Sequence, residues 1–134
     1  MNEDTTPTTE SQRSAEHSLS LWMEMWNTGG EIARRICSDD FRIHFGTSEP
    51  DGSNPGDRIR GAAEFAAFLD WYRTQHAAAS FTERHRAVDG RHGRMLWDVA
   101  VGERRAGGID VFDFTEDGLI REVWSVTGTR SVAG

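Results

Sequence analysis

Lysine is absent from this sequence, because all 15 basic residues are arginines. The chain therefore lacks the amine that forms Schiff bases with carbonyl substrates, and it lacks the lysine of a phosphate-binding P-loop. Cys37 is the only cysteine, which excludes an internal disulfide and a cluster of thiolate metal ligands. We expect Cys37 to pack as a small apolar side chain on a helix face.

The sequence also lacks the net positive charge that binds polyanions and the long apolar run that spans a membrane. Its formal net charge of -7 at pH 7 argues against nucleic acid or an anionic membrane as a partner. No apolar run approaches the roughly 20 residues of a membrane span, and the first residues lack the basic-then-apolar pattern of a signal peptide. We therefore expect a cytoplasmic protein. Histidines and carboxylates show no metal-binding spacing, so we predict neither a metal nor another cofactor.

Tryptophan is abundant, with five residues in a chain of 134. This length suits one domain with one core. The tryptophans indicate a heavily aromatic core or a large concave apolar surface. Residues 1–13 are polar and rich in threonine, so we interpret them as a disordered tail and place the domain at residues 14–130.

Helical periodicity marks the first half of the chain and alternation marks the second half. A first helix is predicted over 14–26 and a third over 62–76, while Thr28 and Glu31 form a capping box for a short second helix. A long loop is predicted over 46–60. Strands are predicted over 41–45, 81–88, 93–101, 105–114 and 119–127. This order predicts an α+β domain whose helices cover one face of a curved antiparallel sheet.

Asp110 is an ionisable residue in an aromatic β-hairpin. Because side chains alternate along a strand, it shares one face with Phe112 and Phe114. If this face points inward, burial raises the pKa of Asp110. Such a carboxyl is a candidate for proton transfer or for hydrogen bonding to an oxyanion. The alternative is that Asp110 pairs with a nearby arginine or caps a loop.

His44 is the second candidate catalytic residue. Alternation places it opposite Phe41, Ile43 and Phe45, so it is a surface residue unless a bulge turns it inward. In the inward position it would assist Asp110 as a base or proton shuttle. Trp22 and Trp124 belong either to the core or to the pocket wall. The candidate substrate-binding residues are all aromatic: Trp22, Phe45, Tyr72, Trp97, Phe112 and Trp124.

Several short motifs follow one another in a recognisable order: Trp26-Asn27-Thr28-Gly29, Ser38-Asp39-Asp40-Phe41, Arg60-Gly61-Ala62-Ala63-Glu64-Phe65, Gly108-Ile109-Asp110-Val111-Phe112, and Asp117-Gly118-Leu119-Ile120 with Trp124. Their order resembles the nuclear-transport-factor-two-like superfamily and, within it, the SnoaL-like group named for polyketide cyclases. The resemblance covers about residues 15–128. It implies a cone-shaped, cystatin-like fold in which three N-terminal helices and a curved antiparallel sheet enclose a pocket.

The resemblance also implies a role for Asp110. In the polyketide cyclases the aspartate of the Gly-x-Asp-x-Phe strand is the acid/base, and this position is Asp110 here. In ketosteroid isomerases the same position holds the neutral aspartate of the oxyanion hole. The base of those isomerases falls on Phe45 and their tyrosine donor on Trp22, so the resemblance does not extend to steroid isomerisation.

These observations lead to one functional hypothesis and two alternatives. The hypothesis is a cavity for a small, largely apolar molecule bearing a carbonyl or hydroxyl, with acid/base chemistry of the isomerase, cyclase or dehydratase type next to the carbonyl. The alternatives are a non-catalytic ligand-binding protein and a dimeric interaction domain. We also predict a homodimer through the convex sheet face, where Ile109, Val111 and Val123 are expected to point outward.

Overall fold

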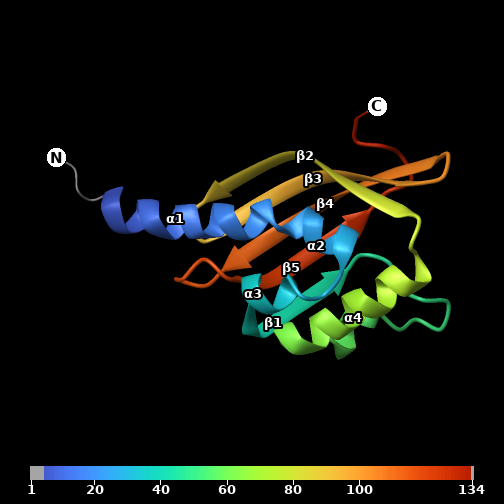
Figure 1. The fold of residues 1–134 in the computed structure, drawn as a ribbon, viewed down its shortest axis with the longest axis horizontal. Helices are drawn as coiled ribbons and strands as arrows, with labels where there is room; N and C mark the ends of the chain where they lie inside the picture. The colour runs from blue at the N-terminus through green and yellow to red at the C-terminus, as the bar shows by residue number, and fades with distance from the viewer. Residues whose placement is uncertain (1–4, 134) are drawn as a thin grey trace.

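The computed structural model describes residues 5–133, in which helices and one strand come before the four remaining strands of a five-stranded sheet (Figure 1). The helices are α1 (Thr5–Ser20), α2 (Trp22–Thr28), α3 (Ala33–Ile36) and α4 (Ala62–Gln75), with a short 3-10 helix η1 (Pro55–Arg58) before α4. The strands are β1 (Cys37–Phe45), β2 (Ala79–Asp89), β3 (His92–Val101), β4 (Arg104–Phe114) and β5 (Ile120–Thr127). The predicted α+β order is confirmed, and the four C-terminal strands lie close to their predicted bounds.

The strands are arranged in the order β1-β5-β4-β3-β2. Neighbours from β2 to β5 are antiparallel and joined by short connections, whereas β1 pairs parallel with β5. A parallel pair needs a long crossover connection, and here η1, α4 and the other strands lie between β1 and β5 in the chain. The result is a curved, open sheet that is antiparallel except at this edge pair.

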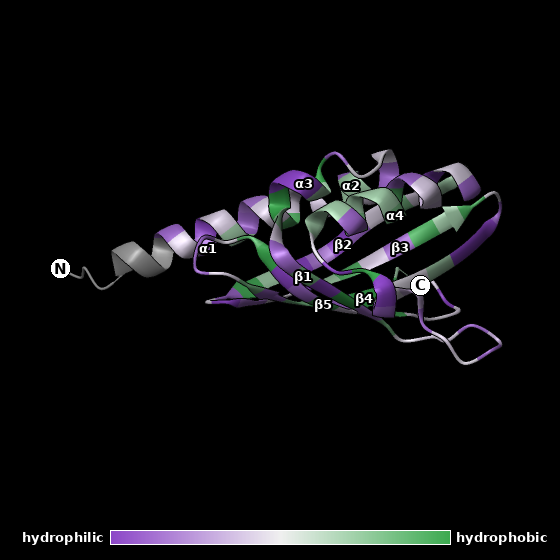
Figure 2. Ribbon diagram, turned by 90° about the horizontal axis from the view of Figure 1, so that it is seen from below, coloured by the Kyte–Doolittle hydropathy of each residue, from purple (hydrophilic) through white to green (hydrophobic). Residues whose placement is uncertain are grey.

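All four α-helices lie on one side of the sheet (Figure 2). The core fills the space between the two layers and is strongly aromatic. The large side chains with no exposed surface include Leu19, Trp22, Phe41, Phe65, Leu69 and Phe112. Cys37 is buried as expected, but it begins β1 and does not lie on a helix face, and burial raises the pKa of its thiol. Within residues 5–133, no helix is both long and apolar enough to cross a membrane.

The predicted first helix, residues 14–26, is divided at Leu21 into α1 and α2, and α1 begins earlier than predicted. It starts at Thr5, so residues 5–13 of the expected tail are helical, and residues 1–4 lie outside the described part of the chain. The turn between β4 and β5 packs against α1, because Ser18 Oγ donates to the Gly118 carbonyl at 2.7 Å and Ser11 Oγ to that of Glu116 at 3.3 Å. These contacts join residues far apart in sequence, so local composition does not reveal them.

The predicted capping box after α2 does not form. Thr28 Oγ1 instead donates to the Glu24 carbonyl at 2.8 Å, and α3 begins without a side-chain cap. The loop packs closely on α4, because a Cβ at Gly30 would overlap the backbone of Ala66. The Gly30 N–H is satisfied by Asp70 Oδ1 at 2.8 Å. Tertiary packing against α4 therefore replaces the local cap.

Candidate functional site

A cavity of about 290 Å³ opens between helices α2 and α4 and the inner face of the sheet. Its lining is mainly aromatic and comes from both layers: Trp26, Phe45, Phe68, Tyr72, Phe81 and Trp97. Asp110 and Ser125 lie at its buried end, whereas Glu49, Trp71 and His76 are exposed at its open end. An apolar cleft with a few convergent polar groups is the usual form of a small-molecule site.

Asp110 is held on β4 with its carboxyl at the buried end of this cavity. It is 2% exposed and lies directly opposite Ser125 on β5. Trp22 Nε1 on α2 donates to Asp110 Oδ2 at 2.8 Å. The other oxygen, Oδ1, is buried and has no hydrogen-bond partner. One oxygen is therefore fixed by the protein, and the other forms no hydrogen bond of good geometry, although Ser125 and Trp97 lie near the carboxyl.

Burial raises the pKa of Asp110 above its usual value of 3.8. Contacts with Ser125, Trp22 and Trp97 act in the opposite direction without cancelling this effect. No arginine pairs with Asp110 among the ion pairs of the described residues, so the salt-bridge interpretation is wrong. In the protonated form of Asp110, the Trp22 N–H on Oδ2 favours Oδ1 as the oxygen that carries the proton.

Trp97 lies beside Asp110 on the neighbouring strand, with its side chain on the inner face. It is 4% exposed, and its Nε1 is a second buried polar atom without a partner. Gly108 is opposite it on β4, and a Cβ at Gly108 would overlap the Trp97 ring. This glycine therefore leaves room for the indole against β4. Of the three unpartnered buried side-chain atoms in the described residues, two belong to the cavity lining.

His44 lies on the opposite face of the sheet from the cavity. Its Nε2 is 2.6 Å from Glu122 Oε2, and its ring stacks on Trp124 at 5.4 Å between centroids. The inward orientation considered for His44 is wrong because the β1–β5 register is regular from Arg42 to Phe45. The irregularity comes before Arg42, so strict alternation holds at His44.

The aromatic candidates divide into three groups. Phe45, Tyr72 and Trp97 line the cavity. Trp22 and Phe112 are fully buried and pack edge to face at 5.2 Å, so they belong to the core, although Trp22 also holds Asp110. Trp124 is 41% exposed on the outer face. Its predicted place in the pocket wall is wrong, because Trp124 pairs with the outward Val111.

Val123 is also on the other face from the one predicted. It pairs with Phe112 on β4 and is fully buried on the inner side. The position of His76 at the end of a helix favours a capping role, yet His76 lines the open end of the cavity beside Tyr72, with 4.5 Å between ring centroids. Its spacing of one helical turn after Tyr72 is the signal that would have placed it on the same stripe of α4.

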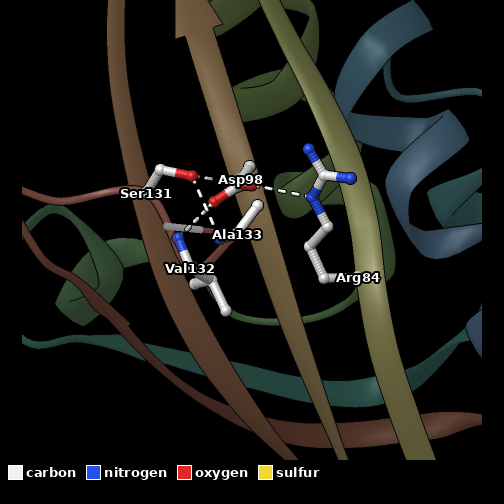
Figure 3. Close-up of polar contacts among 5 residues, drawn as sticks. All are labelled: Arg84, Asp98, Ser131, Val132 and Ala133. Atoms are coloured by element: carbon white, nitrogen blue, oxygen red, sulfur yellow. Dashed lines mark hydrogen bonds and ion pairs between the residues drawn. The ribbon is translucent and has the colours of Figure 1, made fainter.

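A second buried aspartate, Asp98 on β3, lies on the outer face of the sheet (Figure 3). It accepts hydrogen bonds from Arg84 Nε at 2.7 Å, Ser131 Oγ at 3.0 Å and the Val132 N–H at 2.6 Å. Residues 129–133, here called the C-terminal strap, are thereby fixed against the sheet. Burial raises the pKa of Asp98, but these three donors outweigh burial and hold the pKa below its usual value.

Another hollow, of about 1150 Å³, lies between α1 and the β4–β5 turn. Its charged lining is of both signs, with Arg13, Arg35 and Arg91 beside Glu10, Glu116 and Asp117. It is a broad surface groove, and no unpartnered buried side-chain atom of the described residues lines it. Within the same residues, no group of three or more His, Cys, Asp and Glu side chains could hold a metal ion. We therefore take the smaller cavity as the candidate site.

Comparison with known proteins agrees with this architecture. A family model for the SnoaL-like domain matches residues 20–123. A SnoaL-like protein of unknown function from Burkholderia thailandensis E264 is 17% identical with a TM-score of 0.70, over 87% of this chain and 96% of that one. A candidate isomerase of the SnoaL-like family from Agrobacterium tumefaciens C58 is 17% identical with a TM-score of 0.69, over 87% of this chain and 98% of that one.

A third structure is that of a phenazine biosynthesis-related protein from Pseudomonas aeruginosa. It is 18% identical with a TM-score of 0.69, over 96% of this chain and 82% of that one. At these identities the likeness concerns the fold alone. The sequence matches none of the curated proteins with which it was compared.

Proposed function

Because the chain belongs to the SnoaL-like domain family, we propose that it binds a small, largely apolar molecule bearing a carbonyl or hydroxyl and performs acid/base chemistry next to the carbonyl. The reaction is of the isomerase, cyclase or dehydratase type. One observation carries the proposal: Asp110 is a buried acid of raised pKa at the inner end of an aromatic cavity, with Oδ1 free. Buried acids of this kind are frequent at catalytic sites.

Asp110 acts in its neutral form. Its Oδ1–H donates to the carbonyl oxygen of the ligand and stabilises the negative charge that develops as an α-proton leaves. Trp22 fixes the carboxyl through Oδ2 and so keeps the proton on the oxygen that meets the ligand. The other titratable side chains in the lining are Glu49, Tyr72 and His76, which are the candidates for accepting the α-proton.

Exchange of α-protons for deuterium in simple ketones tests this role, whatever the natural substrate is. Cyclohexanone, 1-tetralone and 2-tetralone are incubated with the protein in D2O and followed by NMR. We expect faster exchange than in buffer, and Asp110→Asn should lower the protein-dependent rate by roughly 10² to 10⁴, the usual value of general acid–base catalysis. Asp113→Asn is the matched control, because Asp113 is on the same strand and pairs with His92 instead.

A non-catalytic ligand-binding protein is the second candidate function. The observation that favours it is that Asp110 is the only fully buried titratable side chain described in the cavity lining, with His76 and Glu49 at the exposed end. In that case Asp110 anchors a polar group. Ketones would then bind without exchange faster than in buffer, and Asp110→Asn would change their affinity only modestly.

A homodimer through the outer sheet face remains part of the proposal. Neighbouring strands β4 and β5 expose Ile109, Val111, Trp124 and Val126 there, each between 37% and 50%. Contiguous apolar surface of this kind marks interfaces, and a stable one buries roughly 1,000 Å² or more in total. Sedimentation should therefore give a dimer at micromolar concentration and a monomer for Val111→Glu. A monomeric wild type would contradict the dimer.

A further inference from the structure

Two polar atoms without partners are buried in the wall of the cavity, on adjacent strands. They are Asp110 Oδ1 on β4 and Trp97 Nε1 on β3. Ser125 and Trp97 are both near enough to lower the pKa of Asp110, yet neither reaches Oδ1 with hydrogen-bond geometry, and the Trp97 N–H has no other acceptor. Buried polar groups are nearly always paired, and a donor without an acceptor is costly. Two such atoms side by side indicate that a ligand supplies the missing acceptor.

The Trp97 ring is held rigidly enough to serve as a fixed donor. Its indole crosses β4 over Gly108, where any Cβ would overlap the ring. Phe81 packs against it from β2 at 5.7 Å between centroids, with the planes inclined by 60°. A donor whose orientation is fixed by packing loses little entropy when it binds an oxygen.

The charges in the lining decide which oxygen can bind. The carboxyl groups of Glu49 and Asp110 line the cavity, and no arginine is among the described lining residues. A carboxylate ligand would therefore enter an aromatic cavity without a guanidinium partner and beside acidic groups. A ketone is neutral, and its oxygen has two lone pairs that can accept from two donors.

We propose that Trp97 Nε1 and Asp110 Oδ1 together bind one neutral oxygen acceptor, and that this pair selects ketones over both hydrocarbons and carboxylates of the same shape. The proposal rests on the proposed function in that the same cavity binds the ligand. It adds Trp97 as a specificity-determining donor and gives the ligand class as a neutral ketone.

Three probes with one ring system test the selection: 1-tetralone, tetralin and 1,2,3,4-tetrahydro-1-naphthoate. Affinities at pH 7 should follow the order ketone, hydrocarbon, carboxylate. Trp97→Phe should reduce the ratio of ketone to hydrocarbon affinity by roughly 2- to 10-fold, the usual net effect of one hydrogen bond. Trp71→Phe is the matched control, since Trp71 also lines the cavity but is 54% exposed. It should leave that ratio unchanged.

The indole resonance of Trp97 gives a second measurement on the wild type, so the test does not depend on the variant folding. In a 15N-labelled sample, 1-tetralone should shift the Trp97 Nε1–H proton downfield, and tetralin should not. Tetralin binding as tightly as 1-tetralone would overturn the proposal. So would a ratio unaffected by Trp97→Phe, or tightest binding of the carboxylate.

The outcomes also separate this inference from the proposed acid/base chemistry. If ketones are preferred but no α-proton exchanges, the donor pair stands and the protein is a binder. If exchange depends on Asp110 but the ketone preference survives Trp97→Phe, the chemistry stands and Trp97 is not the second donor.

Discussion

Asp98 and Asp110 are the same residue type on neighbouring strands, and both have little exposed surface, at 5% and 2%, but they lie on opposite faces of the sheet. Asp98 accepts from Arg84, Ser131 and Val132. Asp110 accepts from Trp22, and one of its oxygens has no partner. The two sites therefore differ in their donors and also in depth, because Asp110 lies deep in the core and Asp98 lies near the surface of the outer face.

The pKa values follow that difference. Burial opposes ionisation at both sites, but the donors around Asp98 reverse its effect and leave the pKa lowered. At Asp110 the donors are too few, and the pKa stays raised. A buried carboxyl is therefore structural where its lone pairs are filled, and it becomes available for chemistry where one of its oxygens stays free.

The adjacent glycines Gly107 and Gly108 make room for side chains on opposite faces of the sheet. Gly107 is opposite Asp98, and a Cβ there would lie 2.6 Å from Val132 Cγ2 of the C-terminal strap. Gly108 is opposite Trp97 and makes room for its ring. Gly107 thus leaves room for the strap on the outer face, and Gly108 leaves room for Trp97 in the cavity wall.

The same substitution at the two aspartates should have opposite consequences for stability. Asp98→Asn removes the charge that pairs with Arg84 and fixes the strap, so we expect a loss of about 2–3 kcal/mol in the free energy of unfolding. Asp110→Asn keeps an acceptor for Trp22 and removes a buried ionisable group, so it should be at least as stable as wild type. Chemical denaturation of both variants at pH 7 measures this. Equal losses of stability in the two variants would show that burial alone, and not the hydrogen-bond donors, decides the effect of the substitution.

The pH dependence of stability should separate the same two residues. The pKa of Asp98 in the folded protein is lowered from 3.8. Its contribution to the free energy of unfolding is therefore complete above pH 3.8 and is lost as the pH falls through the folded pKa. The pKa of Asp110 in the folded protein is raised from 3.8. Its contribution to the free energy of unfolding is therefore complete below pH 3.8 and is lost as the pH rises through the folded pKa. Melting temperatures should show the deficit of Asp98→Asn shrinking in acid. The advantage of Asp110→Asn should grow as pH rises above 4.

Single methyl groups at the two glycines provide a finer comparison. Gly107→Ala should displace the strap, and Gly108→Ala should displace the Trp97 ring, each at about 1–2 kcal/mol of stability because well-packed sites tolerate extra atoms poorly. Only Gly108→Ala should change ketone affinity. Titration of both variants with 1-tetralone checks this, and a change in affinity for Gly107→Ala would mean that the two faces are coupled.

The sequence predicts the inner face well because its signals are local. Alternation places Asp110 with Phe112, and the aromatic stripe of α4 places Tyr72 toward the core. These predictions depend only on periods of about 2 and 3.6 residues, which tertiary packing reinforces. Alternation puts Trp97 and Asp98 on opposite faces, and the size of Trp97 favours the pocket for it. Asp98 is then expected on the convex side, either solvent-facing or paired with an arginine, and the Arg84 contact agrees with the latter.

The sequence fails where long-range pairing decides the outcome. The β4–β5 register puts Val123 and Trp124 on faces that local pattern does not settle, whereas the face of His44 follows simple alternation. Nothing near Ser131 shows that it reaches Asp98, and nothing near Trp22 shows that its N–H meets Asp110 across 88 residues. Contacts of this kind depend on the assembled sheet, so they become visible only in the structure.

His44 should give the smallest effect, since it is half-buried on the outer face and has no route to the cavity. His44→Ala removes the contact with Glu122 and the stacking on Trp124, so we expect a stability loss below about 1 kcal/mol, as for other partly exposed ion pairs. Ketone affinity and α-proton exchange should stay at wild-type values, because Asp110 and Trp97 lie on the opposite side of the sheet. Denaturation and tetralone titration of this variant check both parts. A large loss of exchange with the fold intact would mean that the outer face contributes to the cavity's chemistry, and the division between the two faces would fail.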